Sequence, residues 1–158
     1  MIAQALILLL VANGSPLLLR LTLRGRGDWA LDAGVHLRDG RRLFGATKTW
    51  RGVAVALGAS SAVSALLGTG WLVGAGVGAL AMLGDLCSSF VKRRLRLASG
   101  ERALGLDQLP ESLLPLVVYR ETLALTPADI VVVAFAFLAT DLLLSRLLVW
   151  LGVRAHPF

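Results

Sequence analysis

Residues 53–84 read VAVALGASSAVSALLGTGWLVGAGVGALAMLG, 32 positions without one charged side chain. About 20 helical residues cross the roughly 30 Å of hydrocarbon in a bilayer, so this run is too long for a single crossing. The Gly-Thr-Gly sequence at 68–70, near its middle, is a turn signal. We therefore predict two antiparallel membrane helices, at about Lys48–Leu67 and Trp71–Arg94.

The chain as a whole has the composition of a membrane protein. Its 158 residues are 56% hydrophobic and 16% charged, whereas a soluble domain carries about 25% charged residues. Further helices are expected at Ile2–Leu19, with an interruption at 13–16, at Leu113–Leu125 and at Ala128–Leu151. The predicted fold is an all-α integral membrane protein. It forms a single multi-pass domain over residues 1–158, with about five transmembrane helices and two polar loops.

The distribution of cations predicts how this layout is oriented. The two polar loops are Arg20–Arg51 and Leu95–Pro110. Fifteen of the 16 Lys and Arg residues fall on the side of these loops, and Arg120 alone falls on the other side. Loops rich in Lys and Arg stay in the cytoplasm. We therefore predict a protein of the cell membrane, with both polar loops and the C-terminus in the cytoplasm and the N-terminus outside.

The uncharged run ends at Asp85, which is followed by a basic cluster at 92–94. Ser88, Ser89 and Lys92 follow Asp85 at i+3, i+4 and i+7, the spacing of one helix face. A carboxylate at membrane depth is costly and usually faces protein or water. This face is therefore either part of a reactive site or an Asp85–Lys92 structural pair beside basic residues that anchor the topology.

A second candidate segment, residues 39–52, reads DGRRLFGATKTWRG and has the composition of a phosphate-binding loop. Loop glycines let backbone N–H groups approach an anion, and the helix that follows adds its dipole. The spacing is not that of a Walker A motif. The alternative is a basic loop that rests on anionic lipid headgroups.

The third segment, GLDQLP at 105–110, supplies Asp107. This residue is either a second carboxylate of the same site or the N-cap of the next helix. Two carboxylates can hold Mg²⁺, which favours oxygen ligands and substrate phosphates, and Arg and Lys bind phosphate oxygens. Together the three segments suit a reaction between a polyphosphate in water and a phosphate anchored in lipid.

The three segments, in this order, resemble the CDP-archaeol synthase family, short multi-pass relatives of the CTP-dependent phosphatidate cytidylyltransferases. The resemblance rests on Gly40–Gly52, Gly84–Arg94 and Leu106–Leu109. It implies an enzyme, a Mg²⁺-dependent cytidylyltransferase that makes a CDP-activated lipid and pyrophosphate from CTP and a membrane lipid phosphate.

The resemblance also implies roles for individual residues. Asp85, Asp107 and Lys92 would be catalytic, with Asp85 and Asp107 as ligands of Mg²⁺. Substrate phosphates would be bound by cations, hydroxyls and one amide, namely Arg41, Arg42, Thr47, Lys48, Thr49, Arg51, Ser88, Ser89, Arg93 and Gln108.

The expected partners are CTP, the lipid phosphate and membrane lipids, and no nucleic acid. Two alternatives stay open. One is the same transfer onto a diacyl phosphatidate, and the other is a non-catalytic membrane protein that binds lipid phosphates. The sequence does not fix the oligomeric state or the chain type of the lipid.

Overall fold

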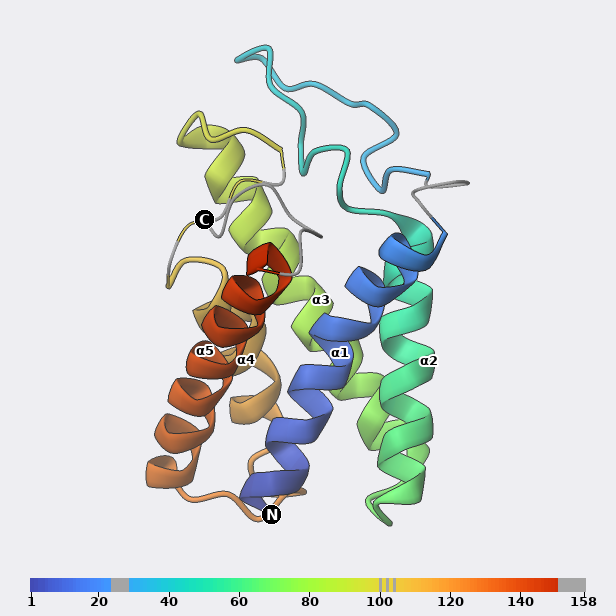
Figure 1. The fold of residues 1–158 in the computed structure, drawn as a ribbon, viewed down its shortest axis with the longest axis vertical. Helices are drawn as coiled ribbons and strands as arrows, with labels where there is room; N and C mark the ends of the chain where they lie inside the picture. Colours follow the sequence, from blue (N-terminus) through green and yellow to red (C-terminus); the bar gives the residue numbers. More distant parts are fainter. Residues whose placement is uncertain (24–28, 100, 102, 104, 151–158) are drawn as a thin grey trace.

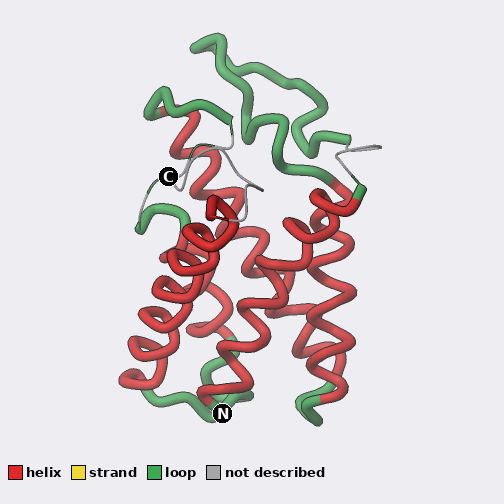
Figure 2. Tube along the Cα trace, in the orientation of Figure 1, coloured by secondary structure: helices red, strands yellow, loops and turns green. Residues whose placement is uncertain are grey.

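The computed structural model describes residues 1–23, 29–99, 101, 103 and 105–150. These residues form five helices: α1 (Ile2–Thr22), α2 (Trp50–Leu66), α3 (Trp71–Arg94), α4 (Gln108–Val118) and α5 (Pro127–Trp150). No strand occurs in this part of the chain, where the only β contacts are the isolated bridges Ala30–Thr49 and His36–Arg42 in the loop before α2 (Figure 2). The predicted all-α fold is confirmed.

The helices lie side by side, and the long polar loops gather at one end of the bundle (Figure 1). The segment 29–49 and the residues that follow α3 lie at this polar end. The N-terminus, the α2–α3 turn and the α4–α5 connection lie at the opposite end. Helices α1, α3 and α5 are long and apolar enough to cross a membrane, whereas α2 is apolar but has only 17 residues. The number of crossings and their orientation stay predictions.

The uncharged run forms the predicted hairpin of α2 and α3. A Cβ atom at Gly74 would overlap the carbonyl of Ser60, so the glycine lets the two helices approach closely. Helix α2 begins at Trp50 rather than at Lys48, because Thr49 is its N-cap. The Thr49 hydroxyl accepts a hydrogen bond of 3.1 Å from the N–H of Gly52, which satisfies one of the free donors of the first turn.

Helix α1 runs without a break through the segment 13–16, where we expected an interruption, and it ends at Thr22 rather than at Leu19. Pro16 lies inside the helix and cannot donate the hydrogen bond that the carbonyl of Ala12 would otherwise accept. Proline is tolerated in membrane helices where neighbouring protein groups satisfy the freed backbone atoms. The prediction of a helix was right, and the prediction of an interruption was wrong.

Helix α4 corrects another boundary. We predicted a helix at Leu113–Leu125, but the helix spans Gln108–Val118. It starts earlier because Pro110 falls in the first turn, where backbone N–H groups have no partner inside the helix. With 11 residues it is about 17 Å long. At α5, the predicted end at position 151 lies outside the described residues.

The apolar core occupies the end of the bundle opposite the polar loops. Its largest fully buried side chains come from four helices and from the α4–α5 connection: Leu8, Leu9, Val77, Leu116, Leu123, Val133 and Phe137. This packing closes the bundle at one end and leaves the polar end as the place for a site.

Candidate active site

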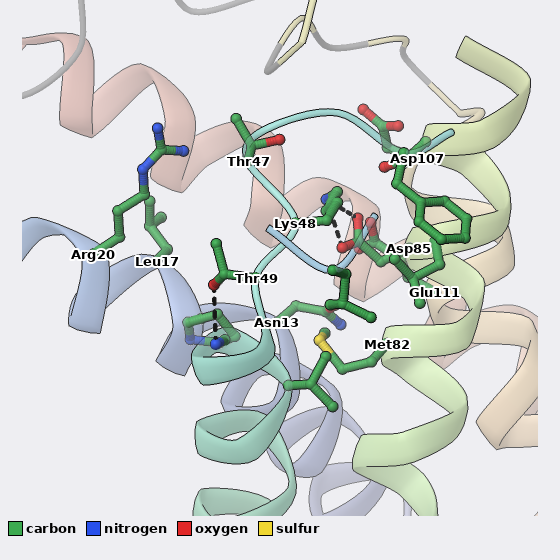
Figure 3. Close-up of a pocket in the computed structure, with 18 of the residues that line it drawn as sticks. Asn13, Leu17, Arg20, Thr47, Lys48, Thr49, Met82, Asp85, Asp107 and Glu111 are labelled. Atoms are coloured by element: carbon green, nitrogen blue, oxygen red, sulfur yellow. Dashed lines mark hydrogen bonds and ion pairs between the residues drawn. The ribbon is translucent and has the colours of Figure 1, made fainter. Parts of the chain in front are cut away.

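A cavity of about 260 Å³ lies between the apolar core and the polar loops. The second half of α1, the second half of α3, the first turn of α4 and the middle of α5 line it, and the start of α2 with the residues before it completes the wall. Figure 3 shows side chains from the loop, α3 and α4 converging there. Ten of the thirteen predicted site residues line it: Thr47, Lys48, Thr49, Arg51, Asp85, Ser89, Lys92, Arg93, Asp107 and Gln108. Arg41, Arg42 and Ser88 are not among the lining residues, and their predicted roles stay predictions.

Asp85 is paired with Lys48, not with Lys92. The Lys48 ammonium donates to both carboxylate oxygens of Asp85 at 2.5 Å (Figure 3). The hydroxyl of Ser88 donates to the backbone carbonyl of Asp85 at 2.9 Å. The alternative of an Asp85–Lys92 structural pair is therefore wrong, and the pair that forms joins α3 to the candidate phosphate-binding loop.

Lys92 is paired with Asp107 instead. The Lys92 ammonium lies 2.7 Å from an oxygen of Asp107, and the two side chains are 7% and 12% exposed. Lys92 also donates to the carbonyl of Glu101 at 2.9 Å. Asp107 occupies the N-cap position of α4, as one of the two interpretations predicted, but its side chain makes no capping hydrogen bond. It accepts instead from the N–H of Ala103 at 3.1 Å. The Asp107 carboxylate forms the buried ion pair with Lys92.

The buried pair predicts that Asp107→Asn destabilises the protein. Removing one charge leaves the Lys92 ammonium buried without its counter-ion, which costs about 3 kcal/mol or more. The apparent melting temperature in detergent should fall clearly. Asp107→Asn combined with Lys92→Gln should recover most of the loss, because neither charge then remains. An unchanged melting temperature of the single variant would show that the pair is not buried in the folded protein.

Glu111 is a site residue that the sequence reasoning missed. Its partly buried carboxyl group lies in hydrogen-bonding contact with that of Asp85 (Figure 3). Gly84 makes this possible, since a Cβ atom there would overlap the Pro110 carbonyl and lie 2.7 Å from the Glu111 nitrogen. The signal in the sequence was the position of Glu111 four residues after Asp107, the spacing of one helix face.

The adjacent carboxyl groups of Asp85 and Glu111 are suited to a divalent cation. In the described part of the chain, no three His, Cys, Asp or Glu residues are placed to hold a metal by themselves. Mg²⁺, however, usually takes one or two carboxylates, with water and phosphate oxygens as its other ligands. The carboxyl groups of Asp85 and Glu111 are adjacent, and Asp85 already binds one cation, the Lys48 ammonium. The donor set therefore suits Mg²⁺ bound together with a polyphosphate.

Two buried residues that line the cavity, Arg93 and Ser89, each have a polar atom without a hydrogen-bond partner among the described residues. Arg93 is 6% exposed and Ser89 is 2% exposed, and both line the cavity. Arg93 donates to the carbonyl of Ala98 at 2.7 Å. Its Nε and the Ser89 hydroxyl are buried and have no hydrogen-bond partner among the described residues. Such donors are costly to leave unpaired, so they are suited to an anionic ligand.

Asp32 holds the loop that carries Lys48, a role that the sequence did not predict. Its carboxylate is fully buried and pairs with Arg42. It also accepts from the backbone N–H groups of Gly34, Phe44 and Gly45 at 3.1, 3.2 and 2.9 Å. Burial alone would raise the pKa of Asp32, but the hydrogen bonds from Arg42 and the backbone lower the pKa below its usual value. The carboxylate thus stays charged and fixes the loop.

Comparison with known proteins identifies relatives of this fold. The sequence profile of the CarS-like CDP-archaeol synthase family matches residues 54–155. The CDP-archaeol synthase of Staphylothermus marinus is 32% identical over 159 residues, which cover 92% of this chain and 85% of that protein. The enzyme of the same name from Thermococcus onnurineus is 39% identical over 109 residues, or 62% of this chain. That match spans only 61% of the Thermococcus protein.

A solved structure has the same fold. It is described as an intramembrane enzyme for the biosynthesis of archaeal membrane lipids. The similarity has a TM-score of 0.74 and 33% sequence identity, and it covers 90% of this chain and 91% of that chain. The bundle described above is therefore that of an α-helical membrane protein.

Proposed function

Because this chain belongs to the CDP-archaeol synthase family, we propose that it is a CTP-dependent cytidylyltransferase of the membrane. It would make CDP-archaeol, or a close isoprenoid relative, and pyrophosphate from CTP and the corresponding lipid phosphate. One observation carries the proposal. A single cavity at the polar end of the bundle combines the carboxylates of Asp85 and Glu111 with the cations of Lys48, Lys92 and Arg93.

The reaction needs positioning and charge neutralisation more than it needs a base. An oxygen of the lipid phosphate attacks the α-phosphorus of CTP, and the bond from that phosphorus to the oxygen that bridges to the β-phosphate breaks. The attacking oxygen is already an anion, so no proton has to be removed. Two polyanions must be held in line, and the charge on the leaving pyrophosphate must be stabilised by fixed donors.

The cations of the cavity would supply these donors. We assign Arg93 and the Ser89 hydroxyl to phosphate oxygens, because both residues line the cavity and each has a buried polar atom without a hydrogen-bond partner among the described residues. Lys48 enters from the loop opposite and reaches the same space (Figure 3). Asp107 would orient Lys92 through their 2.7 Å contact, so that the ammonium is held at the cavity wall.

Asp85 and Glu111 would hold Mg²⁺ together with the phosphates of CTP. When bound, the ion would act as a Lewis acid and as a template that brings the phosphate groups together. The sequence predicted Asp107 as the second ligand. We propose Glu111 in its place, because its carboxyl group contacts that of Asp85.

Incorporation of radiolabelled CTP into lipid tests the function. The purified protein is incubated with CTP, Mg²⁺ and one of three additions: an isoprenoid ether glycerol phosphate, a diacyl phosphatidate, or no lipid phosphate. Labelled CDP-lipid is expected with the isoprenoid substrate. Transfer only to the diacyl lipid would show that the substrate is a diacyl phosphatidate and not an isoprenoid lipid phosphate. No transfer to either lipid would leave the non-catalytic alternative as the better account.

The orientation in the membrane is tested by cysteine labelling. We propose that the polar end of the bundle is cytoplasmic, as the distribution of cations predicts. In a Cys87→Ser background, which removes the exposed native cysteine, Glu121→Cys should react with an impermeant maleimide in intact cells. Ser99→Cys should react only after permeabilisation. The reverse labelling pattern would show that the polar end of the bundle lies outside the cell.

A further inference from the structure

Asp141 is a carboxylate inside α5 that none of the roles above uses. It lies nine residues before Trp150, which corresponds to about 14 Å along the helix. It lines the cavity together with Phe137 and Leu144 of the same helix. A charge at that depth is costly, and it usually pairs with other groups and marks a functional site.

The structure gives Asp141 a defined partner on α4. The side-chain amide of Gln108 donates to an Asp141 oxygen at 2.8 Å. The other end of this amide accepts from the N–H of Gly105 at 2.9 Å. Gln108 is 3% exposed, so its amide is bonded at both ends inside the protein and has one fixed orientation. In this structure it shapes the turn before α4, while its predicted phosphate contact stays untested.

The turn before α4 determines the positions of two carboxyl groups, those of Asp107 and Glu111. Asp107 directly precedes Gln108 and pairs with Lys92. Glu111 follows by one helical turn and contacts Asp85. The hydroxyl of Ser112 also donates to the Gln108 carbonyl at 2.7 Å. Any displacement of Gln108 would therefore move both carboxylates relative to α3.

We infer that Asp141 is a positioning residue of the transferase site. It accepts the hydrogen bond that orients the Gln108 amide, and through that amide it fixes the start of α4 against the cavity. This role needs a hydrogen-bond acceptor at position 141 and does not need a negative charge. For its effect on turnover, the inference rests on the proposed function.

Two replacements of Asp141 distinguish a role as a hydrogen-bond acceptor from a role of its negative charge. Asp141→Asn keeps an oxygen that can accept from Gln108, whereas Asp141→Leu has a similar size and no acceptor. Gln108→Leu removes the donor from the other side. Leu143→Ala, at an exposed neighbour on α5, is the matched control. Two quantities are measured: kcat and KM for CTP, and the hydrogen exchange of the backbone amides at 105–109, which does not depend on activity.

Asp141→Asn should keep kcat within about threefold of the wild type. Asp141→Leu and Gln108→Leu should each lose about 10- to 100-fold in kcat, as is typical when a residue that orients a site residue is removed, with little change in KM. The double variant should be no worse than either single variant, because both break one interaction. Exchange at 105–109 should accelerate in the two Leu variants only.

Loss of activity in Asp141→Asn, with exchange at 105–109 unchanged, would overturn the inference, because it would show that Asp141 acts through its charge on the substrate or a cation. Full activity in Asp141→Leu would overturn it as well. If the wild type itself transferred nothing from CTP, the proposed function would fail separately. The exchange measurement on Gln108→Leu and both Asp141 variants would still decide whether Asp141 stabilises the turn at 105–109.

Discussion

Replacing Asp85 with Asn should lower the rate of cytidylyl transfer by about 10²- to 10³-fold, while the protein still inserts and folds. The Asn side chain keeps the size and an acceptor oxygen but loses the negative charge that holds a divalent cation. Loss of that charge removes several kcal/mol of transition-state stabilisation, and each 1.36 kcal/mol is about a tenfold change in rate. The rate is measured as incorporation of labelled CTP into lipid at fixed Mg²⁺.

The control for Asp85→Asn is Glu121→Gln, which removes an exposed carboxylate and should leave the rate unchanged. Glu121 belongs to the α4–α5 connection, which lies at the opposite end of the bundle (Figure 1). Melting curves in detergent separate lost activity from lost folding, because Asp85→Asn also frees Lys48. Near-normal turnover of Asp85→Asn would mean that this carboxylate serves only to hold Lys48. The proposed position of the cation would then be wrong.

Adding one methyl group at Gly84 should abolish most of the activity. The new Cβ of Gly84→Ala would meet the backbone of Pro110 and Glu111, which cannot move aside as the end of a flexible side chain can. The start of α4 must shift away from α3, and the contact between Glu111 and Asp85 is lost with it. We expect a fall of at least about 100-fold in kcat, since misplacement by about 1 Å has that effect on a positioned site.

Gly58→Ala is the matched control for Gly84→Ala. Gly58 lies in the middle of α2, and nothing is found within 4 Å of a Cβ atom built there. Alanine is the better helix former by about 1 kcal/mol, so this variant should be active and at least as stable as the wild type. An active Gly84→Ala enzyme would show that the close contact between α3 and α4 is not needed for transfer.

The helical hairpin could be predicted from the sequence because its signals are local. A charge-free run that is too long for one crossing and has a Gly-Thr-Gly turn at 68–70 predicts two antiparallel helices. The structure has these two helices, α2 and α3. The start of α4 could not be predicted in the same way. The apolar run that begins at Leu113 suggested the helix, but the polar turn before it belongs to the same helix because its side chains face a cavity, not lipid.

The candidate residues could be predicted more reliably than their partners. Asp85, Lys48 and Lys92 were chosen by type and spacing, and all three line the cavity. Spacing along one helix suggested that Asp85 meets Lys92. The actual partner, Lys48, is 37 residues away in the sequence, and only the folded loop brings it there. Glu111 was missed because it precedes the apolar run at Leu113 that suggested the helix. Asp141 was given no role because it stands in an otherwise apolar segment, where the sequence pattern does not distinguish the side that faces lipid from the side that faces the cavity.

The short length of α2 has a consequence for the lipids around the protein. Its 17 residues span about 26 Å, less than the roughly 30 Å of hydrocarbon in an average bilayer. A membrane accommodates a short helix by thinning beside it. The first turn of α2, with Arg51 and Gly52, borders the cavity. On the predicted layout, in which α2 crosses the membrane, headgroups next to α2 would be drawn toward the midplane, and the proposed lipid phosphate would reach the depth of the cavity with less displacement of its chains from the leaflet.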